Sequence, residues 1–78
     1  MLHCILFSTL GCHLCDEAEA MLVPLLSELP IQIEWVDIIE KEEWVERYGV
    51  HIPVLMRQDT QAELYWPFTT DQAREFLK

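Results

Sequence analysis

The chain has 78 residues, which suffices for one folded domain over residues 1–78 and is too short for two. Hydrophobic residues make up 51% and charged residues 24%, a composition that excludes an intrinsically disordered segment. The 14 acidic residues outnumber the 5 basic ones. We therefore expect neither nucleic acid nor an anionic membrane surface as a partner, because both are bound through clustered Lys and Arg side chains.

The first half of the chain predicts a strand, a helix and a second strand. Residues 2–7 form a short apolar run before Gly11, which is typical of a buried strand. Over residues 12–28, apolar side chains recur at three- and four-residue steps, the pattern of an amphipathic helix. Residues 31–36 alternate apolar and polar at first and predict the second strand.

The second half predicts a helix, a hairpin and a last helix. Asp37 resembles an N-cap, and it opens a helix that should end at Gly49. Residues 52–56 and 62–66 are typical of two strands joined by a turn. Thr69 and Thr70 are expected to cap the final helix, as in a capping box.

The predicted order is therefore β-α-β-α-β-β-α. The first β-α-β unit should be parallel and right-handed, and the short turn makes the last two strands antiparallel. Together these elements predict an α/β fold with a four-stranded mixed sheet and helices on both faces. Aromatic residues such as Trp44, Tyr48, Trp66 and Phe68 are expected to pack in its core.

The cysteine content indicates the compartment. Three cysteines, an odd number, argue against a scaffold of structural disulfides. The apolar start lacks a basic leader and a cleavage site of small residues, and no apolar run approaches the roughly 20 residues that span a bilayer. We expect a reducing compartment, the cytoplasm. Cys4, in the first strand, should behave as a small buried hydrophobe.

The motif that carries chemistry is Cys12-His13-Leu14-Cys15, at the junction of the first strand and helix. Two cysteines at this spacing lie on one helical turn, so they can form a small-ring disulfide with little backbone movement. Cys12 meets the unpaired N–H groups of the helix start, which stabilise a thiolate, and Cys15 should be less exposed. We predict thiol–disulfide exchange with Cys12 as nucleophile and Cys15 as resolving thiol.

Two other functions remain open at this point. A CxxC also occurs in zinc sites, which need a second pair of ligands, and His3, Cys4 and His51 form no such pair. No metal site is therefore predicted, but a metal or iron–sulfur carrier that uses Cys12 is one alternative. A redox-inert interaction domain is the other. Coloured or zinc-containing protein would favour the first, and a pair of cysteines that never oxidises would favour the second.

The CxxC after the first strand, together with His51-Ile52-Pro53-Val54-Leu55, resembles glutaredoxins of the thioredoxin superfamily. The run Gly-Cys-His-Leu-Cys-Asp is similar to that of a small glutaredoxin-like family. The resemblance implies a thioredoxin-like fold and a thiol–disulfide oxidoreductase. It also implies that Pro53 is a cis-proline facing the CxxC, and that the backbone of Ile52 pairs with the bound substrate. His13, Leu14 and Thr70 are the remaining candidates for substrate binding.

The chain departs from common glutaredoxins around the expected glutathione site. Those proteins carry Pro-Tyr or Pro-Phe between the cysteines, a lysine before the first one and a Gly-Gly-x-Asp turn. Here the positions hold His13-Leu14, no lysine, and Trp-Pro-Phe-Thr-Thr-Asp over 66–71. A standard glutathione site is therefore not expected. The candidate partners are a disulfide-containing protein or glutathione disulfide, with glutathione as co-substrate, no bound cofactor, and a monomeric chain.

The charges beside the motif bear on its reactivity. A helix N-terminus stabilises an anion by about 0.3–1 kcal/mol. A carboxylate about 7 Å away opposes this by about 1 kcal/mol at an effective dielectric near 40. Asp16 and Glu17 should therefore make the Cys12 thiolate less favoured than in a typical glutaredoxin, and a protonated His13 or His51 would restore it.

Overall fold

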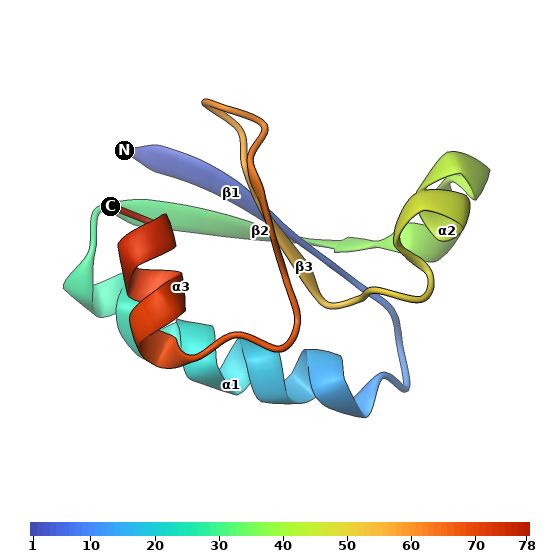
Figure 1. Ribbon diagram of the computed structural model, residues 1–78, viewed down its shortest axis with the longest axis horizontal. Helices are drawn as coiled ribbons and strands as arrows, with labels where there is room; N and C mark the ends of the chain where they lie inside the picture. Colours follow the sequence, from blue (N-terminus) through green and yellow to red (C-terminus); the bar gives the residue numbers. More distant parts are fainter.

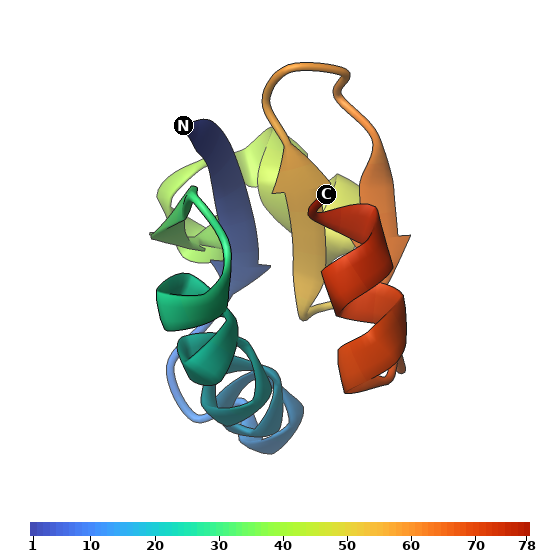
Figure 2. The same ribbon diagram turned by 90° about the vertical axis from the view of Figure 1, so that its left-hand side faces the viewer.

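The structure, a computed structural model, describes residues 1–78 and contains a four-stranded sheet and three α-helices. The elements follow the order β1 (Leu2–Ser8), α1 (His13–Glu28), β2 (Ile31–Asp37), η1 (Ile38–Glu40), α2 (Glu42–Tyr48), β3 (Val54–Arg57), β4 (Glu63–Tyr65) and α3 (Thr70–Phe76). The strand order is β2-β1-β3-β4, which Figure 2 shows side by side and in which Figure 1 labels the first three strands. Strands β1 and β2 are parallel, and the other two pairs are antiparallel, so the mixed sheet is as predicted.

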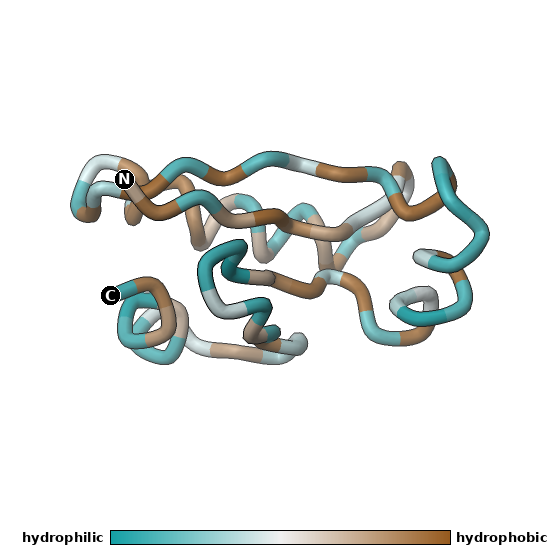
Figure 3. The backbone as a smooth tube through the Cα atoms, turned by 90° about the horizontal axis from the view of Figure 1, so that it is seen from above, coloured by the Kyte–Doolittle hydropathy of each residue, from teal (hydrophilic) through white to brown (hydrophobic).

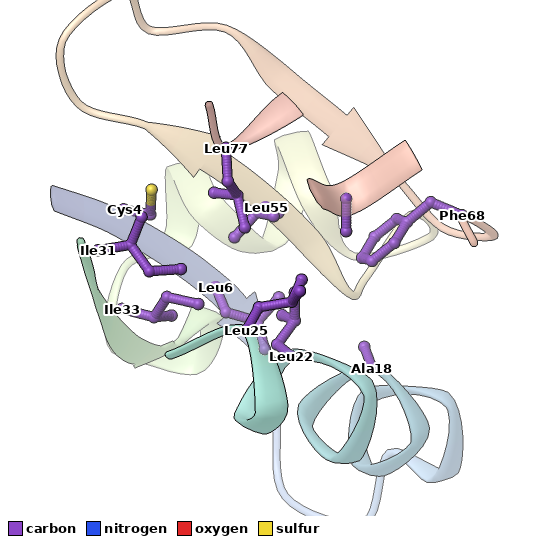
Figure 4. Packing of buried hydrophobic residues seen from close by; sticks show 11 residues of the cluster. Cys4, Leu6, Ala18, Leu22, Leu25, Ile31, Ile33, Leu55, Phe68 and Leu77 are labelled. Carbon is purple, nitrogen blue, oxygen red and sulfur yellow. The ribbon is translucent and has the colours of Figure 1, made fainter. Parts of the chain in front are cut away.

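The helices lie on both sides of the sheet. Helices α1 and α3 cover one face, and α2 lies apart from them near one end of the sheet (Figures 1 and 2). The larger core cluster, between the sheet and α1 and α3, includes Leu6, Leu22 and Leu55 (Figure 4). The smaller cluster, which includes Phe7 and Tyr48, packs under α2.

Strand periodicity explains how one sheet serves two clusters. Neighbouring side chains on a strand point to opposite faces, so Leu6 joins the larger cluster and Phe7 the smaller one. The same alternation appears along β2 as alternating teal and brown in Figure 3. The inner strand β1 is thus buried on both faces, which fits its nearly continuous apolar sequence. None of the helices combines the length and apolar character needed to cross a membrane.

The predicted single helix from Asp37 to Gly49 is wrong. The Asp37 carboxylate accepts a hydrogen bond from the Ile39 N–H at 3.1 Å, and this local turn caps the three-residue 3-10 helix η1. Lys41 then returns to an extended conformation, with φ −138° and ψ 131°, before α2 begins. This break lets Ile38 reach the smaller cluster while the chain continues beside the sheet. Helix α2 ends with Gly49 as its C-cap, as predicted.

The hairpin strands are shorter than predicted. Strand β3 begins at Val54, since Pro53 has no N–H to donate to a ladder and the Ile52 N–H donates to the Tyr48 carbonyl instead. Strand β4 covers only Glu63–Tyr65. The predicted capping box is confirmed at Thr69 and Gln72, which exchange two hydrogen bonds of 3.1 and 2.8 Å.

Candidate redox site

A tight turn delivers Cys12 to the start of α1. Gly11 has a φ of 75°, in the left-handed region that glycine adopts without strain. Cys12 follows as the N-cap of α1, and its Sγ accepts a hydrogen bond from the Cys15 N–H at 3.1 Å. An orphan N–H of the first helical turn thus points at the leading sulfur, as the sequence predicts.

Cys12 and Cys15 form a disulfide with a Cα–Cα distance of 5.2 Å. The two sulfurs differ in exposure, since Cys12 is half-buried whereas Cys15 is only 4% exposed. The predicted difference in exposure between the two cysteines is confirmed. A pair of this kind can take up and release two electrons, with the outer sulfur reachable by a second molecule and the inner one shielded.

The Ile52–Pro53 segment lies at the same end of the sheet. Val54 pairs with Phe7, so the residue before Val54 lies beside the end of β1, where the turn to Cys12 begins. The Ile52–Pro53 peptide bond is cis, and so is Trp66–Pro67, which the sequence did not indicate. The Ile52 N–H donates a hydrogen bond to the Tyr48 carbonyl, whereas the Ile52 carbonyl oxygen accepts none from the backbone.

The other predicted substrate-binding residues are exposed. The His13 side chain is 89% exposed, and its Nε2 lies 3.9 Å from the Glu17 carboxylate. Leu14 is 45% exposed on the same helical turn. Thr70 opens α3 but makes no side-chain hydrogen bond, so the prediction that it caps the helix is wrong, because Thr69 alone holds that position.

The charge around the pair is negative. A cavity of about 200 Å³ reaches Cys15 and is lined by Asp16, Glu19, Trp35 and Asp37, with no Lys or Arg. Most basic side chains are paired elsewhere: Arg47 with Glu63, Arg57 with Asp59, Arg74 with Glu28 and Asp71, and Lys78 with Glu75. A larger hollow of about 740 Å³ lies away from the cysteine pair, beside the chain termini.

Glu19, Trp35 and Asp37 line the cavity beside Cys15, although no pattern in the sequence marks them as its neighbours. The parallel register pairs Ser8 with Asp37, so the ends of β1 and β2 meet beside the CxxC. The general rule that sites lie at the carboxyl ends of parallel strands could have found Asp37. No group of three or more His, Cys, Asp and Glu residues is arranged to hold a metal ion.

Cys4 lies in the larger core cluster as a free thiol that is 2% exposed, as predicted. Burial raises its pKa from 9.0 to about 11. Burial and a hydrogen bond to Glu63 also raise the pKa of Tyr48, from 10.0 to about 12. Both groups therefore keep their protons to higher pH in the folded state than in the unfolded state.

These two groups predict a loss of stability at alkaline pH. A group whose pKa is raised by folding stabilises the folded state below its unfolded pKa, and this contribution is lost as pH rises through the folded value. We expect the free energy of unfolding of the oxidised protein, measured in urea, to fall between pH 9 and 12. Cys4→Ala should flatten the curve between pH 9 and 11, and an unchanged slope there would contradict the assignment.

Comparison with known proteins gives a family. The model of the glutaredoxin-like domain (DUF836) matches residues 3–78. The crystal structure of protein XcR50 from X. campestris is 30% identical, with a TM-score of 0.82 over 95% of this chain and 93% of that one. The solution structure of protein Ne2328 from Nitrosomonas europaea is 26% identical, with a TM-score of 0.83 over 99% and 92% of the two chains.

No curated protein matches the chain. The two structural neighbours share its four-stranded mixed sheet with helices, so the predicted α/β fold of the thioredoxin-like, glutaredoxin type is confirmed. The family model spans nearly all residues and includes the Cys12–Cys15 pair, which indicates a redox-type role. The chain belongs to the glutaredoxin-like domain family.

Proposed function

We propose that this protein is a thiol–disulfide oxidoreductase that works through the Cys12–Cys15 pair. The observation that carries the proposal is the arrangement of that pair: a disulfide at the start of α1, with a half-buried outer sulfur and a buried inner one. An N–H of the helix start donates to the outer sulfur, which would stabilise a Cys12 thiolate. Membership of the glutaredoxin-like family supports the same chemistry.

The reaction proceeds in two exchanges. In the reduced protein the Cys12 thiolate attacks a substrate disulfide, forms a mixed disulfide and releases the first substrate thiolate. Cys15, after losing its proton to solvent, attacks Cys12 and releases the second substrate thiolate. The protein thereby loses two electrons and regains the Cys12–Cys15 disulfide. A reductant of the cytoplasm must return it to the dithiol.

We expect the Ile52–Pro53 segment, at the same end of the sheet as the pair, to form the substrate site. Pro53 is buried at the end of the sheet, and Ile52 is half-buried beside it. Because the Ile52 N–H is bonded to Tyr48, a substrate backbone pairs there through the Ile52 carbonyl oxygen alone. His13 and Leu14 follow Cys12 on the exposed first turn of α1, and we expect them to contact the substrate there.

A disulfide in a polypeptide is the preferred substrate. Glutathione disulfide is an anion, and the cavity that reaches Cys15 is lined by carboxylates, including those of Asp16 and Glu19. The last helix is preceded by no glycine pair that could hold glutathione, and Thr70 stays exposed. Glutathione is therefore a poorer partner than a protein disulfide.

A trapped intermediate tests the proposal. In Cys15→Ser the second exchange is blocked, so incubation of the reduced variant with a peptide disulfide should accumulate a one-to-one mixed disulfide. Mass spectrometry of proteolytic fragments should place the peptide on Cys12. The wild-type protein under the same conditions should show only the Cys12–Cys15 disulfide and reduced peptide. If no adduct forms, or if it forms only on Cys4, the assignment of Cys12 as nucleophile and Cys15 as resolving thiol is wrong.

A further inference from the structure

A carboxylate on β4, that of Glu63, connects this strand to helix α2. It accepts hydrogen bonds from the Tyr48 hydroxyl and, at 3.0 Å, from the Tyr65 hydroxyl. The Arg47 guanidinium lies 3.4 Å from it. Its side chain is 14% exposed, whereas that of Arg47 is 65% exposed. Burial alone would raise the pKa of Glu63, but the hydrogen bonds from both tyrosines and the charge of Arg47 lower it, so Glu63 is ionised.

Tyr48 links Glu63 to the Ile52 backbone. It is the one buried residue of α2, where its ring stacks on Phe7 with centroids 4.2 Å apart. Its carbonyl oxygen accepts hydrogen bonds from the His51 N–H at 2.8 Å and from the Ile52 N–H at 2.9 Å. The position of the Ile52 backbone thus depends on the Tyr48 carbonyl, and the position of the Tyr48 hydroxyl depends on its hydrogen bond to Glu63.

Tyr65 supplies a second route between the same groups. Its hydroxyl donates to Glu63, and its ring lies 5.0 Å from the ring of His51. Tyr65 also pairs with Val54 in the sheet, directly after the cis-proline. Glu63 therefore accepts hydrogen bonds from one tyrosine that precedes Ile52 in the chain and from one that follows it.

We propose that Glu63 is a positioning residue for the Ile52–Pro53 segment. By holding the Tyr48 hydroxyl it fixes the end of α2, and with it the Ile52 carbonyl oxygen that receives the substrate beside Cys12. This inference rests on the proposed function for its effect on turnover. Glu63 does not touch the reacting sulfurs, so its loss weakens productive binding and leaves the chemistry at Cys12 intact.

Three variants and one control separate positioning from general stability. Glu63→Ala removes the acceptor, and Tyr48→Phe removes the donor while keeping the ring that stacks on Phe7. Glu63→Gln keeps an oxygen that can accept from Tyr48. The control is Glu28→Gln, another carboxylate paired with an arginine, between α1 and α3. The measurements are KM and kcat with a peptide disulfide, hydrogen exchange of the His51 and Ile52 amides, and the melting temperature.

We expect Glu63→Ala and Tyr48→Phe to raise KM about 10-fold, with kcat changed less than about twofold, because a hydrogen bond to a charged group is lost. Exchange of the His51 and Ile52 amides should quicken about 10-fold relative to amides of β1, and Glu63→Gln should recover most of both effects. The control should match the wild type. If Glu63→Ala fails to fold, Tyr48→Phe decides the question with the same measurements.

The inference is overturned if KM and the exchange of these two amides stay at wild-type values. It is also overturned if both change only in proportion to a global loss of stability seen equally in β1. Should the wild-type protein reduce no disulfide at all, the proposed function fails. The amide exchange then still tests, by itself, whether Glu63 fixes the position of Ile52.

Discussion

Cys12→Ser should lower kcat/KM for reduction of a peptide disulfide by at least about 1,000-fold, because a serine hydroxyl is barely ionised at neutral pH and is a poor nucleophile toward sulfur. Cys15→Ser should also stop multiple turnover, but it should keep a single burst of mixed-disulfide formation. The measurement is the rate of thiol release from the peptide under pre-reduced, single-turnover and multiple-turnover conditions.

Cys4→Ser provides the matched control, since it removes the third thiol without touching the pair. Cys4 is 2% exposed within the larger core cluster, and burial raises its pKa to about 11, so it is both covered and protonated at neutral pH. Its replacement should leave kcat/KM within about twofold of the wild type if that variant remains folded. Equal losses in the Cys4 and Cys12 variants would contradict the division of roles.

The features that the sequence predicts well are set by local chemistry. The spacing of Cys12 and Cys15 decides that both lie on one helical turn, whatever surrounds them. The reciprocal hydrogen bonds of Thr69 and Gln72 likewise involve only neighbours in the chain. The apolar periodicity of residues 12–28 identifies α1 to within one residue, because a long amphipathic pattern outweighs single interruptions such as Pro24.

The features that escape prediction depend on partners distant in the chain. The helix is interrupted at Lys41 because Ile38 packs in the smaller cluster. No residue type near Lys41 predicts this interruption. From the sequence alone, Glu63 is predicted to be an ordinary surface charge. Only the β3–β4 register and the placement of α2 show that its carboxylate lies beside the Tyr48 hydroxyl. The acidic cavity beside Cys15 likewise requires the parallel register of β1 and β2.

The second large effect concerns the charge of the substrate. A peptide disulfide flanked by Lys and Arg should be reduced with a kcat/KM at least about 10-fold higher than the same peptide flanked by Glu, since a field of one sign at a site raises the encounter rate of opposite charges. The formal net charge of −9 and the cavity with Asp16, Glu19 and Asp37 beside Cys15 set the sign. Glutathione disulfide should behave like the acidic peptide.

Ionic strength and two double variants distinguish an effect of charge from an effect of the shape of the peptide. The ratio between the basic and acidic peptides should shrink as salt rises from about 0.02 to 0.5 M, because the screening length falls to a few ångströms over that range. Asp16→Asn combined with Glu19→Gln should lower the ratio at low salt. Asp71→Asn combined with Glu75→Gln removes the same number of charges from α3, away from the lining of that cavity, and should lower the ratio less. Equal turnover of both peptides at every salt concentration would show that the carboxylates serve solubility alone, and selection among substrates would then rest on the apolar contacts of Leu14 and Ile52.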